Sequence, residues 1–307
     1  MAANATVWNA WYRAARPRTL TATYVPLGLA AVIAVQAGTF DLVRFILSLI
    51  GALFLQIAAN LINEYWDYRR GADTLKQAGQ GMIIKEGVLT PQRVLIGAIA
   101  TVVAGSLIGL FLLTQSGPLL LWIGLGGVLV VITYTAGPFP LAYNGLGEVA
   151  VFIFMGPLMV LGAYYVMARE FSWTPIVAAI PIGFMVAAIL HANNVRDIDA
   201  DRAVNKRTLA VLFGLRVAKL EYLGLVGGAY VAVGVMILLG VMPITTLAVL
   251  ITAREAYRLI QIIFNSRDTA LLHQAQGRTA KLHGQFGLWL VIGWAVWLVI
   301  QRLAVSG

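Results

Sequence analysis

Nine long apolar segments constrain the fold of this chain more than any other feature of its sequence. They lie at about residues 19–36, 43–63, 93–113, 118–136, 148–167, 175–194, 218–240, 243–264 and 285–304. Each is close to the roughly 20 residues that cross a bilayer as an α-helix. The segments are too long for strands and lack the alternating pattern of a membrane barrel, and helices satisfy their own backbone in lipid. We therefore expect an all-α integral membrane protein with about nine transmembrane helices, folded as one domain over residues 1–307.

The composition narrows the classes of function. Hydrophobic residues make up 60% of the chain and charged residues 11%, whereas a soluble domain carries about 25% charge. This excludes an ordinary soluble enzyme, a disordered chain and a fibrous repeat. Cysteine is absent, which excludes disulfides, thiolate metal sites, Fe–S clusters and cysteine nucleophiles. Three histidines are too few for a histidine-rich metal site.

Basic residues are distributed unevenly over the loops. With the N-terminus inside, the inner segments 1–18, 64–92, 137–147, 195–217 and 265–284 hold 3, 4, 0, 5 and 3 Lys and Arg, and the outer loops hold only Arg169. Loops rich in Lys and Arg stay in the cytoplasm. We predict a multi-pass protein of the cell membrane with a cytoplasmic N-terminus and an outer C-terminus. The net charge of +9 then reflects the basic inner loops of a protein whose partner is the lipid bilayer, and we expect no nucleic-acid partner.

Six of the 13 carboxylates fall in two short stretches. The polar residues of the first cluster are Asn60, Asn63, Glu64, Asp67 and Asp73. Asn60, Asn63 or Glu64, and Asp67 follow i, i+3/i+4, i+7 spacing, which is one face of a helix. Gly71 frees the backbone, so that Asp73 folds back toward that face.

The second cluster repeats this pattern. Asn194, Asp197 and Asp201 share a helical face, while Asp199 points elsewhere. Each cluster lies where an even-numbered predicted span reaches the cytoplasm. We therefore expect the two clusters to lie at the same depth and to face each other.

Oxygen ligands of this kind suit Mg²⁺, which binds through carboxylates and substrate phosphates. The expected metal ligands are Asn63, Glu64, Asp67, Asp73, Asp197 and Asp201. Basic residues follow each cluster, namely Arg69 and Arg70, and then Arg202, Lys206 and Arg207. Carboxylates, metal and cations together make a site for a diphosphate leaving group. The alternative is that both clusters are solvated helix ends with interspersed charges.

Four stretches carry a resemblance to a known family. Residues 15–20, 59–73, 134–148 and 193–210, extended weakly by 279–283, resemble the motifs of the UbiA superfamily of intramembrane prenyltransferases. Stretches 134–148 and 193–210 are most similar to its 1,4-dihydroxy-2-naphthoate polyprenyltransferase branch. Two positions depart from the pattern: Glu64 stands where the family has Asp, and Asn205 where it has Gly. Asn tolerates left-handed backbone, so we expect the turn at 205 to persist.

The resemblance implies a central cavity that opens near the cytoplasmic face, and a magnesium-dependent reaction. A polyprenyl diphosphate ionises, and its prenyl group passes to 1,4-dihydroxy-2-naphthoate with loss of CO₂, giving demethylmenaquinone in menaquinone biosynthesis. The implied catalytic residues are Asp67, Asp197 and Asp201, and the implied substrate-binding residues are Asn60, Asn63, Arg69, Arg70, Tyr134, Asn194, Arg202, Lys206 and Arg207. The allylic cation requires a dry pocket with aromatic faces.

Other functions stay open at this stage. The aromatic acceptor could instead be 4-hydroxybenzoate or homogentisate. A secondary transporter is an alternative from another class, although its charges would be expected at the membrane midplane and here they lie at one face. Arg254, Glu255 and Arg258 lie inside the eighth segment. Either they line a cavity, or the transmembrane span is shorter than the apolar segment. A lone membrane-end histidine such as His191 is usually only hydrogen-bonded.

Overall fold

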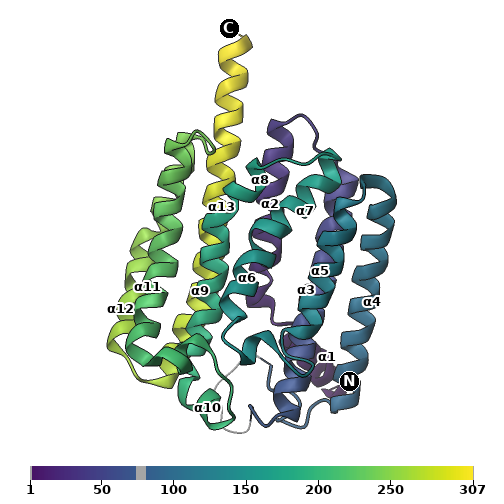
Figure 1. Cartoon of the computed structure of the whole chain (residues 1–307), viewed down its shortest axis with the longest axis vertical. Coiled ribbons are helices and arrows are strands. Elements are labelled where there is room, and N and C mark those ends of the chain that lie inside the picture. The colour runs from purple at the N-terminus through teal and green to yellow at the C-terminus, as the bar shows by residue number, and fades with distance from the viewer. Residues whose placement is uncertain (1, 74–80, 307) are drawn as a thin grey trace.

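The computed structural model describes residues 2–73 and 81–306, which form a bundle of helices (Figure 1). Its α-helices are α1 (Ala2–Ala15), α2 (Thr21–Gln36), α3 (Leu42–Arg69), α4 (Pro91–Ser116), α5 (Leu119–Thr133), α6 (Gly147–Met155), α7 (Pro157–Ala168), α8 (Thr174–Ala178), α9 (Ile180–Arg196), α10 (Ile198–Ala203), α11 (Leu209–Leu238), α12 (Ala253–Asn265) and α13 (Thr269–Ser306). Three 3₁₀-helices are η1 (Pro17–Thr19), η2 (Leu141–Tyr143) and η3 (Ile244–Thr252). The all-α prediction is confirmed, since no strand occurs in the described ranges.

The predicted count of nine spans is not confirmed. Among the described residues, five helices are long and apolar enough to cross a membrane, with α6 and α7 taken as one. A sixth is added if α1 with η1 and α2, which are bent by 50°, count as a single span. The segment 118–136 forms the 15-residue α5. The segment 243–264 divides into η3 and α12, and Arg254, Glu255 and Arg258 lie in the first two turns of α12.

Apolar side chains lie on both the inside and the outside of this bundle. Trp294, Tyr222 and Phe286 are fully buried in a core built mainly by α2, α7, α9, α11 and α13. Trp122, Val231 and Leu238 are among many large apolar side chains that are exposed. A helix that is apolar all round belongs in a core or a membrane, so the outer surface is suited to lipid.

The junction between α6 and α7 requires glycine. A Cβ atom added at Gly156 would lie 2.6 Å from the carbonyl oxygen of Phe152 and 2.8 Å from Cα of Gly183. Both distances are too short for real Cβ contacts. The absence of side chains at Gly156 and Gly183 therefore lets this junction lie directly against α9, whose C-terminal end leads into the second acidic cluster.

A second, smaller cluster of buried apolar residues lies at one end of the bundle. Ala10 of α1, Ile83 and Leu89 of the segment before α4, Leu61 of α3 and Val94 of α4 are buried together there. Figure 1 shows α1 and α10 at this end and the C-terminus at the opposite end. Which end faces the cytoplasm stays a prediction from the charge distribution.

Candidate active site

The polar face of α3 is turned inward near the end of the bundle where α1 and α10 lie (Figure 1). Asn60, Asn63 and Asp67 line a cavity of about 390 Å³, as their spacing predicts. Asn63 donates through Nδ2 to Oδ2 of Asp67 at 3.4 Å, and Nδ2 of Asn60 donates to the carbonyl oxygen of Ala15 at 2.9 Å. The latter bond ties α3 to the end of α1.

Glu64 is not among the residues that line this cavity in the described chain. Its carboxylate accepts hydrogen bonds from the backbone nitrogens of Met82, at 3.0 Å, and Ile84, at 3.5 Å, and lies 3.5 Å from Nη2 of Arg16. One residue turns a helix by about 100°, so Glu64 faces away from Asn63. The structure thus attaches Glu64 to the segment before α4, while Asn63, Asp67 and Asp73 line the cavity.

Asp73 returns to the cavity as predicted. Gly71 has a φ of 74°, a left-handed conformation that glycine adopts without strain. The turn is closed by a hydrogen bond of 2.8 Å from the nitrogen of Ala72 to the carbonyl oxygen of Asp67. Asp73 is 5% exposed and lines the cavity beside Asp67.

The second cluster reaches the same cavity from the end of α9 and the junction with α10. Asn194 and Asp197 are buried and line it. Arg196 holds Asp197 with two bonds, from Nε to Oδ1 at 2.7 Å and from Nη2 to Oδ2 at 2.6 Å. Asp199 is exposed and pairs with Arg202 at 3.0 Å, which confirms that it points elsewhere. The two predicted clusters therefore meet at one cavity.

Asp201 is not among the described residues that line the cavity, but it pairs with Lys206, which does line it. Nζ of Lys206 lies 3.3 Å from Oδ1 of Asp201, and Lys206 lines the cavity. Asn205 has a φ of 56°, so the predicted left-handed turn is confirmed. The nitrogen of Lys206 donates to the carbonyl oxygen of Asp201 at 2.9 Å and closes this turn.

The chain after the turn alternates between inside and outside. Lys206 is buried, Arg207 is exposed and Thr208 is buried, as extended backbone dictates. The nitrogen of Arg207 donates to the carbonyl oxygen of Tyr143 at 3.0 Å, in a short parallel bridge with Asn144. The backbone of Arg207 is therefore fixed, while its side chain is directed to the surface.

Three further predicted substrate-binding cations also lie outside the cavity wall. Arg69 and Arg202 are exposed. Arg70 is half-buried, donates to the carbonyl oxygen of Gly137 at 2.8 Å, and stacks over the ring of Tyr143 at 4.7 Å. Of the five cations that follow the two clusters, only Lys206 lines the cavity in the described chain.

Tyr143 lies in the stretch 134–148 and joins the two acidic clusters, a role that the stretch alone does not predict. Its hydroxyl donates to Oδ1 of Asp67 at 2.7 Å, and Nζ of Lys206 lies 5.5 Å from its ring centre. Burial, and then the charge of Asp67, raises the pKa of Tyr143. The hydroxyl therefore stays protonated and remains a donor to Asp67.

The cavity continues into the apolar part of the bundle. Beyond the polar end its walls include Leu55 of α3, Ile108 and Leu112 of α4, Ile123 of α5 and Leu158 of α7. The predicted Tyr134 lies on the wall near the polar end. A polar end followed by an apolar passage suits a ligand with a charged head and a hydrocarbon tail.

Sequence reasoning did not assign several wall residues. Arg16 and Gln276 line the polar end of the cavity, and Gln276 is 1% exposed. Arg16 lies in the stretch 15–20, to which no site role was assigned, and Gln276 lies outside the stretches that resemble the family. Both come from elements distant in sequence from the acidic clusters, so only the fold brings them there.

Comparison with known proteins places the chain among membrane prenyltransferases. A model of the UbiA prenyltransferase family matches residues 24–282. The 1,4-dihydroxy-2-naphthoate octaprenyltransferase of Bacillus subtilis (strain 168) is 32% identical over 278 residues, covering 91% of this chain and 89% of that protein. The protein of the same name from Escherichia coli (strain K12) is 32% identical over 279 residues, covering 89% of this chain and 91% of that protein.

Solved structures share the fold. A UbiA homolog from Archaeoglobus fulgidus, bound to DMAPP and Mg²⁺, matches with a TM-score of 0.65 at 16% identity, covering 92% of this chain and 98% of that one. An apo UbiA homolog from Aeropyrum pernix K1 matches with a TM-score of 0.66 at 19% identity, covering 88% and 97%. At these identities the likeness concerns the arrangement of the helices.

Proposed function

The chain belongs to the UbiA prenyltransferase family, and from this we propose that it transfers a polyprenyl group from polyprenyl diphosphate to 1,4-dihydroxy-2-naphthoate. The reaction releases CO₂ and diphosphate and gives demethylmenaquinol, the reduced form of demethylmenaquinone. The bacterial relatives named for this activity align over most of both chains, which supports this acceptor over 4-hydroxybenzoate or homogentisate. Family membership also favours an enzyme over a secondary transporter.

One observation carries the proposal: the two acidic clusters line the polar end of one cavity whose other walls are apolar. A diphosphate at the polar end would place its hydrocarbon chain in the apolar passage. This arrangement separates charge from hydrocarbon within one ligand, as a polyprenyl diphosphate requires. It would not be expected of two unrelated solvated helix ends.

The donor set fits Mg²⁺. Asn63, Asp67, Asp73 and Asp197 all line the cavity and offer oxygen atoms, the ligands that Mg²⁺ prefers. The Archaeoglobus homolog bound to DMAPP and Mg²⁺ shows the same fold. Mg²⁺ held by these residues would neutralise the departing diphosphate. Asp201 supports this site through Lys206, and Glu64 holds the segment before α4.

The chain's own residues then have distinct tasks. Lys206 is a wall cation that binds diphosphate oxygens. Tyr143 donates to Asp67 and so holds that carboxylate in place. The apolar walls exclude water, which would otherwise trap the allylic cation, and Tyr134 offers an aromatic face to it. An electron-rich carbon of the acceptor ring attacks that cation.

A product assay tests the proposal. Purified protein in detergent or nanodiscs is incubated with one polyprenyl diphosphate, Mg²⁺ and an equimolar mixture of the three aromatic acceptors. We expect mass spectrometry to find prenylated naphthoquinol that has lost the mass of CO₂, and no product when EDTA replaces Mg²⁺. Prenylated 4-hydroxybenzoate or homogentisate as the main product would overturn the assignment of the acceptor. Absence of any prenylated aromatic would overturn the function.

A further inference from the structure

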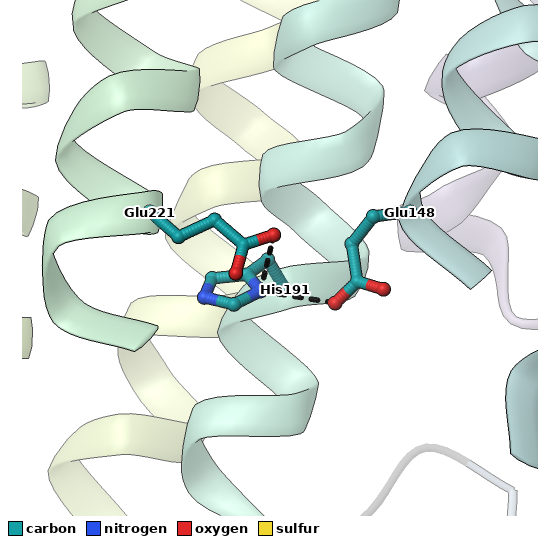
Figure 2. A group of neighbouring side chains, drawn as sticks. All are labelled: Glu148, His191 and Glu221. Carbon is teal, nitrogen blue, oxygen red and sulfur yellow. Dashed lines mark hydrogen bonds and ion pairs between the residues drawn. The ribbon is translucent and has the colours of Figure 1, made fainter. Parts of the chain in front are cut away.

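Three ionisable side chains meet inside the bundle beside the cavity. Figure 2 shows Glu148, His191 and Glu221 pointing toward one another, from α6, α9 and α11. Glu148 and His191 are buried, and Glu221 is half-buried. Ionisable groups within a membrane protein's interior are costly and usually mark a functional site. None of the three lines the cavity in the described chain, so their role must act through a neighbour.

The ring of His191 is held at both nitrogens. Nε2 lies 2.8 Å from the carbonyl oxygen of Ala218, which can only accept, so Nε2 carries a hydrogen. Nδ1 lies 3.0 Å from Oε1 of Glu148 and 3.6 Å from Oε1 of Glu221. Without a hydrogen on Nδ1, its lone pair would face two carboxylate oxygens. The geometry therefore requires one proton shared at Nδ1.

Asn194 shows where that proton resides. Its Nδ2 donates to the same Oε1 of Glu148 at 2.7 Å. Two donors that converge on one oxygen fit an ionised carboxylate, so the proton belongs to His191. Because the amide nitrogen of Asn194 faces Glu148, its Oδ1 atom is left as an acceptor. Asn194 is itself a wall residue of the cavity.

We propose that Glu148, His191 and Glu221 form a positioning network that holds Asn194 so that its Oδ1 accepts a hydrogen bond from a hydroxyl group of the aromatic acceptor. This inference rests on the proposed function, which supplies a hydroxylated aromatic ring. An amide oxygen repels diphosphate oxygens, so the diphosphate is not its partner. Accepting a hydrogen bond from the hydroxyl raises the electron density of the ring that attacks.

Kinetics with each substrate varied separately test this role. We expect Glu148→Gln to raise the KM for the aromatic acceptor about tenfold, with less than a twofold change in the KM for prenyl diphosphate and in the Mg²⁺ dependence. Glu255→Gln is the matched control, because Glu255 pairs with Arg278 outside the cavity wall, and it should change neither KM. Asn194→Ala should raise the KM for the acceptor further, and adding Glu148→Gln to it should have no further effect. Equal changes in both KM values, or a shifted Mg²⁺ dependence, would overturn the assignment.

The shared proton has its own spectroscopic test. The chain has three histidines, so ¹⁵N-histidine NMR of the full-length protein can assign His191 from the spectrum of His191→Gln. We expect both ring nitrogens of His191 to be protonated at neutral pH in the wild type. An unprotonated Nδ1, or a stoichiometric metal that is lost in His191→Gln, would overturn the network. Failure of the proposed function would differ, because wild-type protein would form no prenylated aromatic whatever the histidine spectrum shows.

Discussion

Replacing Lys206 with Met should weaken the use of prenyl diphosphate, while replacing its neighbour Arg207 with Met should not. Lys206 is 7% exposed and lines the cavity, so its ammonium group can bind the diphosphate directly. Loss of one hydrogen bond to a charged group costs about 1.5–3 kcal/mol. That corresponds to roughly a 10- to 150-fold loss in kcat/KM for prenyl diphosphate, at 1.36 kcal/mol per decade.

The same change also affects folding, and this effect can be separated. Nζ of Lys206 lies 3.3 Å from Oδ1 of Asp201, which is 1% exposed. Removing one partner of a buried ion pair costs about 3–5 kcal/mol of stability. Lys206→Met should therefore lower the thermal unfolding midpoint. Adding Asp201→Asn removes the stranded charge and should restore much of the stability without restoring activity.

Arg207→Met is the matched control. The side chain of Arg207 is exposed, and its hydrogen bond to Tyr143 uses the backbone nitrogen, which Met retains. A surface change of this kind alters free energies by about 0.5 kcal/mol at most, which is roughly twofold in kcat/KM. Initial rates with prenyl diphosphate varied at fixed acceptor decide the matter. If Arg207→Met loses tenfold while Lys206→Met is unchanged, the assignment of the diphosphate-binding cation is refuted.

Three further outcomes are expected. Asp67→Ala should abolish turnover in a folded protein, because it removes a hard oxygen ligand from the cavity wall; near-wild-type rates at saturating Mg²⁺ would contradict this. Tyr143→Phe should cost about 1 kcal/mol, or roughly fivefold in rate, through loss of its bond to Asp67, and an unchanged rate would remove Tyr143 from the site. A single cysteine at Lys85 should be protected from an impermeant thiol reagent in intact cells and one at Glu170 should react, since basic loops stay inside; the opposite labelling would invert the topology.

The positions of the helices could be predicted because lipid leaves a chain few choices. Backbone groups without water must bond within a helix, so each apolar segment falls on one or two helices. Their lengths could not be predicted in the same way. The helix α5 has 15 residues, none of them buried, and η3 has nine. A count of apolar residues alone does not distinguish either from a full span.

The candidate site could be predicted where helical spacing determines direction. Asn60, Asn63 and Asp67 are on one face at i, i+3 and i+7, and all three line the cavity. Spacing alone left Asn63 and Glu64 as alternatives for this face, and Glu64 turns toward neighbouring hydrogen-bond donors, whereas Asn63 lines the cavity. Those donors are the backbone nitrogens of Met82 and Ile84, which are distant in sequence. Lys206 and Arg207 point in opposite directions because of the turn at Asn205, whose direction relative to the cavity depends on the fold.

The network around His191 could not be predicted from the sequence. Glu148 and His191 are separated by 43 positions, and Glu221 comes from a third helix, so no motif connects them. Taken singly, His191 is a membrane-end histidine expected only to form hydrogen bonds, and it does form them. The functional meaning comes from the acceptors it faces: a carbonyl oxygen at one nitrogen and two carboxylates at the other. A neutral imidazole could not donate a hydrogen bond from both nitrogens to these acceptors. The second proton on His191 therefore pairs with Glu148, which in turn accepts a hydrogen bond from Asn194 at the cavity wall.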